Sequence, residues 1–252
     1  MPHTGDSSAE QAARDAAYDN VAAVPGSREW MAQLRADSAH FRAHPQNGWH
    51  DVQWGPEPAN RWTLYPSHRA NAPCLIFTHG GDWQGNRPED FACLAEGLIA
   101  HGWSVAMPAH TLAPAASLTR IVHELEQALD WLAEQGDSHG ISGPYVLSGW
   151  SAGGTLATLL LGHSLITSGL CLSGIHDLAP LRETYLNAAL NLSAQEIEEF
   201  SPLHLSPCPK PLCLAFGTQE LPVFGRDAAA LHGLRNRHQC PTTPMPVHQM
   251  DK

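Results

Sequence analysis

The stretch GPYVLSGWSAGGTLATLLLG, residues 143–162, joins a short apolar run to a segment rich in alanine and leucine. The apolar run is typical of a strand buried on both faces of a sheet, and the segment after it favours a helix. Between them lies Gly149-Trp150-Ser151-Ala152-Gly153, a G-x-S-x-G pattern whose small residues allow a tight turn. The stretch therefore predicts a nucleophilic serine, Ser151, held at a sharp turn above the sheet. The alternative is an ordinary glycine-rich turn without chemistry.

The same alternation of apolar runs and helical patterns continues on both sides of Ser151. It predicts an α/β fold in which a mostly parallel sheet is covered by helices on both faces. Predicted strands cover residues 72–81, 103–110, 143–149, 168–175 and 210–217, with two antiparallel edge strands at 48–55 and 61–67 and a weak last strand at 243–250. Predicted helices cover residues 88–102, 117–136, 152–162 and 224–238, with a helical lead-in over 18–43 and a mostly helical insertion over 177–209. We expect residues 1–16 to be flexible and residues 17–252 to form one domain.

Composition limits the classes of function. The 252 residues include 14 basic and 25 acidic side chains, for a net charge of −11. We expect no nucleic-acid partner, because phosphate contacts need clustered Lys and Arg. The N-terminus lacks the basic and apolar pattern of a signal peptide, and no apolar run is long enough to span a membrane. The six cysteines lie far apart, so we expect reduced thiols, a cytoplasmic location and no metal site.

A second motif, THGGDW at residues 78–83, lies at the end of the apolar run at 72–81. A His-Gly-Gly turn at this point exposes backbone N–H groups where a substrate carbonyl oxygen would gain charge. The N–H groups of Gly81, Asp82 and Ala152 are the candidates for this oxyanion hole, with Gly80 shaping the loop and His79 holding it in place. The two motifs together indicate acyl-transfer hydrolysis, with a small molecule as the substrate.

Several further segments complete a family pattern: AYDNVAAVP (17–25), GWSVAMPAHTLAP (102–114), LSGIHDLAPL (172–181) and AFGTQELPVF (215–224). With the two motifs above, they resemble the kynurenine formamidase (arylformamidase) and small esterase group of the α/β-hydrolase superfamily. The resemblance implies an α/β-hydrolase fold with a short helical cap and a Ser–acid–His triad, without metal or cofactor. It also implies small formamides, such as N-formylkynurenine, or short-chain carboxylic esters as substrates.

The acid of the triad has two candidates in the sequence. In α/β-hydrolases the chain order is serine, acid, histidine. Glu220 follows the predicted strand at 210–217, where the resemblance places the acid, and it could also be an exposed loop carboxylate. Asp177, after the preceding strand, is the second candidate.

The base is harder to place, although the chain has 16 histidines. The resemblance puts this histidine just beyond the last strand, and the spacing predicts it a few residues after Lys252. His248 lies inside the predicted strand and is a weak candidate, and His176 and His238 are weaker still. We therefore expect a chain that stops before its base. The alternative is a catalytically impaired or inactive α/β-hydrolase that serves as a binding module.

Four residues bear on the substrate pocket. Asp82 and His110 stand where relatives commonly have tyrosine, and a carboxylate at residue 82 would oppose charge on an oxyanion. Trp83 and Trp150 are candidates for an aromatic pocket or, equally, for the hydrophobic core. The sequence is compatible with a homodimer but does not decide the oligomeric state.

Overall fold

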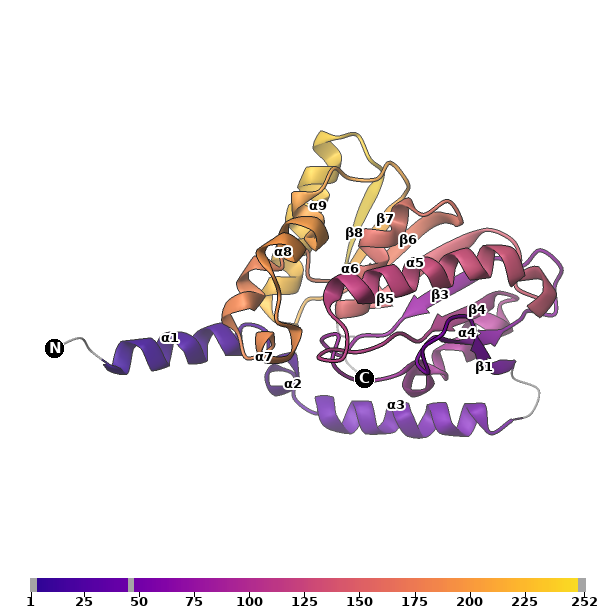
Figure 1. Cartoon of the computed structure of the whole chain (residues 1–252), viewed down its shortest axis with the longest axis horizontal. Coiled ribbons are helices and arrows are strands. Elements are labelled where there is room, and N and C mark those ends of the chain that lie inside the picture. The colour runs from indigo at the N-terminus through magenta and orange to yellow at the C-terminus, as the bar shows by residue number, and fades with distance from the viewer. Residues whose placement is uncertain (1–3, 45–47, 249–252) are drawn as a thin grey trace.

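The computed structural model describes residues 4–44 and 48–248, which form one eight-stranded sheet with helices on both sides (Figure 1). The strand order is β1-β2-β4-β3-β5-β6-β7-β8. β1 is antiparallel to β2 and β2 to β4, whereas all other neighbours are parallel. The predicted α/β-hydrolase fold is confirmed. The strands are β1 Trp49–Gln53, β2 Arg61–Tyr65, β3 Cys74–Thr78, β4 Ser104–Pro108, β5 Tyr145–Trp150, β6 Ile166–Leu172, β7 Leu212–Gly217 and β8 Thr242–Val247.

The sheet separates two hydrophobic clusters because side chains alternate along each strand. Leu64 and Ile76 pack with helices α5, α6 and α9 on one face, whereas Tyr65 and Phe77 pack with α3 and α4 on the other. The helices are α1 Thr4–Ala16, α2 Asn20–Ala23, α3 Ser27–Arg42, α4 Leu94–Ala100, α5 Leu118–Gln135, α6 Ala152–Leu159, α7 Asn187–Leu190, α8 Ala194–Phe200 and α9 Pro222–Arg237. Within the described ranges, no helix is both long and apolar enough to cross a membrane.

Within the N-terminal segment 1–16, for which we expect flexibility, residues 4–16 form helix α1. Helix α1 extends from the body of the molecule (Figure 1), and two side chains near its end contact the insertion. Gln11 donates to the Glu183 carbonyl at 2.8 Å, and the Asp15 carboxylate accepts from the Tyr185 backbone N–H at 2.8 Å. These long-range hydrogen bonds, which propensity along the chain does not reveal, anchor the helix.

The insertion between β6 and β7 is built from short helical pieces, among them α7 and α8. Helix α8 begins with a capping box, in which the Ser193 hydroxyl accepts from the Glu196 N–H and the Glu196 carboxylate accepts from the Ser193 N–H. Glu196 also accepts from the Thr119 N–H at 3.0 Å. The insertion is thereby joined to the start of helix α5.

One buried carboxylate holds the loop that follows β4. Glu124, on the inner face of α5, accepts from the Thr111 N–H at 2.7 Å and from Arg120 Nε at 2.8 Å. Burial raises the pKa of Glu124, but the hydrogen bonds from Thr111 and Arg120 outweigh burial and hold the pKa below its usual value. The ionised form therefore stabilises the folded state, since it is the form that these donors require.

We predict that Glu124→Gln lowers the free energy of unfolding by about 1–3 kcal/mol at pH 7, because the charge-assisted bonds become neutral ones. A depressed folded-state pKa contributes stability above the unfolded pKa, and this contribution is lost as pH falls through the folded value. The difference from wild type should therefore shrink as pH falls below about 4.5. Urea unfolding between pH 7 and pH 3 measures it, with the exposed Glu126→Gln as control. A difference that stays constant with pH would contradict this role.

The outer edge of β8 lacks most of its hydrogen-bond donors. The carbonyls of Pro241 and Val247 accept from the backbone N–H groups of Leu212 and Thr218 on the β7 side. The backbone groups of successive residues point to opposite edges of a strand. The even-numbered residues of β8, which include Pro244 and Pro246, therefore direct their backbone groups away from β7. Because proline has no N–H, this edge offers carbonyl oxygens without matching donors, which hinders the pairing of another strand.

We predict that the double variant Pro244→Val, Pro246→Val self-associates more than wild type, because it restores two outward donors to an exposed edge strand. Light scattering after size-exclusion chromatography, over a range of protein concentrations, measures this. Pro56→Val, at an exposed loop position, is the matched control. An unchanged mass distribution in the double variant would show that the prolines do not protect this edge.

Candidate active site

Ser151 lies at the turn between β5 and α6, where the sequence predicted it. Its φ of 54° and ψ of −121° are uncommon for a residue with a side chain. Its backbone N–H donates to the Leu172 carbonyl at 2.8 Å, and its carbonyl accepts from the Thr155 N–H. These bonds hold the serine in a strained conformation at the carboxyl end of the strand.

Glycines permit the close backbone approach around this turn. A Cβ on Gly149 would lie 2.1 Å from the Gly153 carbonyl oxygen, and a Cβ on Gly153 would lie 2.1 Å from the Thr78 carbonyl oxygen. A Cβ on Gly80 would lie 2.6 Å from the Trp150 carbonyl oxygen and 3.1 Å from Ser151 Cβ. Any side chain at these three positions would force strands β3 and β5 apart from helix α6. The HGG loop therefore lies directly against Ser151.

The loop after β3 leaves backbone donors without partners. Gly81, Asp82 and Trp83 have φ values of 119°, 56° and 59°, so consecutive residues adopt positive φ. Among the described residues, the N–H groups of Gly81 and Asp82 donate to no other group. The N–H of Ala152, as the first of helix α6, has no partner within its helix. Unpaired N–H groups on both sides of a serine are what an oxyanion hole requires.

The Gly80 carbonyl is clamped by two side chains. It accepts from His79 Nδ1 at 2.9 Å and from Asn86 Nδ2 at 3.1 Å, and Asn86 Oδ1 accepts in turn from Arg35 of helix α3 at 2.8 Å. In a trans peptide the N–H points opposite to the carbonyl. The clamp therefore sets the direction of the Gly81 N–H. Neither Asn86 nor Arg35 was predicted from the sequence. The only sequence signal for this clamp is that Asn86 lies in a Gly-rich turn.

His79 and His110 stack on each other inside the protein. Their ring centroids are 4.9 Å apart at an interplanar angle of 8°, and each Nδ1 bonds to the carbonyl of the following residue. Burial lowers the pKa of both rings, and burial together with His79 brings the pKa of His110 to about 3. Both rings are therefore neutral at pH 7. His79 serves the loop through its bond to Gly80, in keeping with the expected structural role.

Glu220 lies just after β7, with one carboxylate oxygen held and the other free. Its Oε2 accepts from the Ser173 hydroxyl at 2.6 Å and from the Gly217 N–H at 3.2 Å. Its Oε1 has no hydrogen-bond partner among the described residues. Ser173, which follows β6 at a φ of 50°, was not identified from the sequence. The second acid candidate, Asp177, instead accepts from the Ala179 N–H at 3.0 Å.

None of the candidate histidines is joined to Ser151 or Glu220 by a hydrogen bond within residues 4–44 and 48–248. His248 is exposed at the end of β8, with Nδ1 3.4 Å from the Thr218 hydroxyl. His176 is buried, with Nε2 3.8 Å from Cys171 Sγ. His238 caps the end of helix α9 on the surface. The residues after His248, including the expected position beyond Lys252, lie outside the described part of the chain.

The remaining candidates surround the oxyanion loop. Burial raises the pKa of Asp82, and the nearby Asp19 carboxylate raises it further. Trp83 is 2% exposed and belongs to the main hydrophobic cluster. Trp150 is half-buried, with its ring centroid 5.9 Å from that of Phe91. Trp83 thus packs as a core residue, whereas Trp150 keeps some exposure next to Ser151.

Comparisons with known proteins show which chains are similar to this one. The family profile BD-FAE matches residues 63–167. A kynurenine formamidase of Danio rerio is 30% identical over 162 residues, covering 60% of this chain and 54% of the relative. The chain spans about half the length of the curated relatives it matches.

Solved structures show the same fold over nearly the whole chain. One from a Silicibacter species has a TM-score of 0.81 at 24% identity and covers 92% of this chain and 89% of that one. Esterase B of Lactobacillus rhamnosis has a TM-score of 0.71 at 16% identity, with coverages of 91% and 85%. This chain thus has an α/β-hydrolase fold and is similar in sequence to kynurenine formamidases and in structure to esterases.

Proposed function

We propose that this chain is a serine hydrolase that cleaves a small formamide or a short-chain carboxylic ester through an acyl-enzyme on Ser151. The observation that carries the proposal is Ser151 in a strained turn, packed against a loop whose N–H groups at Gly81 and Asp82 are unpaired. Strain of this kind persists only where surrounding structure enforces it, and it is frequent at active sites. The similarity to kynurenine formamidases and an esterase supports the substrate class.

The reaction would proceed in two steps. Ser151 Oγ attacks the carbonyl carbon while a base takes its proton, and the N–H groups of Gly81, Asp82 and Ala152 stabilise the negative oxygen. The proton passes to the leaving amine or alcohol as the C–N or C–O bond breaks. Water then attacks the acyl-enzyme, which releases formate or a short carboxylic acid and restores the Ser151 hydroxyl. Glu220 would orient the base and stabilise its protonated form.

The second candidate function is an inactive hydrolase scaffold that binds small molecules. The observation in its favour is that, among the described residues, no histidine bonds to Ser151 or Glu220. Removal of a triad histidine lowers kcat by about a millionfold and leaves only the contribution of binding and the oxyanion hole. The two candidates therefore differ by orders of magnitude in turnover.

We predict that Ser151→Ala lowers the turnover of p-nitrophenyl acetate and N-formylkynurenine by at least about a thousandfold and abolishes labelling by a fluorophosphonate. Ser148→Ala is the matched control, because Ser148 is a buried serine of β5, just before the turn, without a side-chain partner among the described residues. His248→Ala tests the base and should match Ser151→Ala if His248 fills that role. Equal turnover by wild type and Ser151→Ala would instead support the scaffold. The ratio of formamide to ester turnover separates the two substrate classes.

We predict that Asp82→Asn raises kcat/KM by about three- to tenfold at pH 8, because it removes a negative charge next to the oxyanion. The pKa of Asp82 is raised, so the wild-type carboxyl loses its charge as pH falls toward acid. The gain should therefore shrink at lower pH. Asp19→Asn is the control that removes the neighbouring charge without changing the loop. A gain that is the same at every pH would show that the Asp82 charge does not act on the oxyanion.

A further inference from the structure

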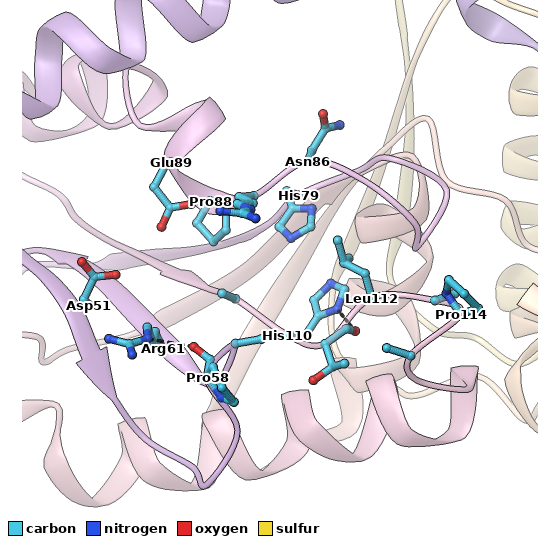
Figure 2. A pocket seen from close by; sticks show the side chains of 16 residues that line it. Asp51, Pro58, Arg61, His79, Asn86, Pro88, Glu89, His110, Leu112 and Pro114 are labelled. Atoms are coloured by element: carbon cyan, nitrogen blue, oxygen red, sulfur yellow. Dashed lines mark hydrogen bonds between the residues drawn. The ribbon is translucent and has the colours of Figure 1, made fainter. Parts of the chain in front are cut away.

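A cavity of about 760 Å³ lies beside the oxyanion loop and is distinct from the surroundings of Ser151. Its walls are the segment 86–89, the loop 109–115 and residues of β1, β2 and the loop between them (Figure 2). Neither Ser151, Trp150 nor Ala152 lines it. His79 and Asn86 do line it, and these are the side chains that clamp the Gly80 carbonyl. The loop thus separates this cavity, hereafter the His110 cavity, from the nucleophile.

Two neutral imidazoles line this cavity with their acceptor atoms free. A carbonyl oxygen only accepts, so His79 Nδ1 and His110 Nδ1 must carry the proton in their bonds to Gly80 and Thr111. Each Nε2 is then an acceptor without a proton. His110 is 4% exposed, and its Nε2 is buried without a partner among the described residues. A buried acceptor left unsatisfied costs about 1–3 kcal/mol, which a ligand that donates to it would recover.

The rest of the lining indicates the kind of ligand. Pro58, Pro88 and Leu112 supply apolar walls, and the cavity is within the size range of small-molecule sites. The charged side chains at the cavity balance in sign, with Arg61 and Arg87 against Asp51 and Glu89. This balance favours neither an anion nor a cation. A small uncharged molecule with an apolar body and one N–H or O–H donor matches this lining.

We propose that the His110 cavity is a second small-molecule site, which binds a phenol or an arylamine whose N–H or O–H donates to His110 Nε2. The proposal does not depend on hydrolysis at Ser151. A ligand here would contact His79 and Asn86, which set the direction of the Gly81 N–H. Occupancy of the His110 cavity therefore has a direct route to the oxyanion loop.

The experiment measures binding of phenol and aniline to the full chain by calorimetry and by NMR of 15N-labelled histidine. We expect the His110 Nε2 resonance to shift on binding. Anisole and N,N-dimethylaniline, which have the same rings without a donor, should bind at least about tenfold more weakly, since a hydrogen bond to a buried acceptor is lost. Equal affinity for phenol and anisole would overturn the proposal, as would a phenol shift confined to other histidines.

Two variants test the location. His110→Phe keeps a ring in the stack but removes the acceptor, and it should reduce phenol affinity at least about tenfold while leaving anisole affinity nearly unchanged. Leu112→Trp places a larger side chain in the cavity wall and keeps the His110 acceptor, so it should weaken the binding of both ligands. Thermal unfolding followed by circular dichroism shows that each variant folds, and Leu112→Trp keeps the test decisive if His110→Phe does not. Wild-type phenol affinity in Leu112→Trp would contradict the assigned site.

Discussion

The contact between backbones at the carboxyl ends of β3 and β5 is the constraint on which the site depends. Gly153 fits against the Thr78 carbonyl only because it has no side chain, and the same holds for Gly80 against the Trp150 carbonyl. These contacts bring the Ser151 turn and the HGG loop together. The resulting positive φ values at Ser151, Asp82 and Trp83 cost on the order of 1–3 kcal/mol each, which the packing of the two hydrophobic clusters must offset.

Rigidity of the oxyanion loop comes from outside the loop itself. The Gly80 carbonyl is held by His79, which is stacked on His110, and by Asn86, which is held by Arg35. The loop is therefore held by helix α3 through Arg35 and Asn86, and by the segment after β4 through the stack of His110 on His79. Because these hydrogen bonds are directional, they fix the Gly81 N–H in the folded protein. In the proposed mechanism, a donor fixed in this way would stabilise the oxyanion without reorganisation.

The sequence predicted the parts of the fold that follow from local patterns. Apolar runs located β3 to β7, helical spacing located α5, and small residues located the turn at Ser151, because these signals are contained in single segments. The predicted helix at 88–102 is instead a 3-10 turn at Pro88–Phe91 followed by α4. The sequence did not predict Asn86, Ser173 or the anchoring of α1. Each of these makes a hydrogen bond to a backbone atom or to a residue that is distant in sequence, and no pattern along the chain reveals such bonds.

Two groups of the candidate site, the Ser151 hydroxyl and one oxygen of Glu220, lack hydrogen-bond partners among the described residues. Within the described residues, the Ser151 hydroxyl has no hydrogen-bond partner, and Glu220 has one oxygen fixed by Ser173 and Gly217 and one oxygen free. In the proposed mechanism, the base would accept a proton from the Ser151 hydroxyl and donate an N–H to the Glu220 carboxylate. Only imidazole combines both abilities in one side chain near neutral pH. Under the proposed function, a histidine that follows β8 would approach Glu220, since β8 runs parallel to β7 and its carboxyl end lies next to that of β7.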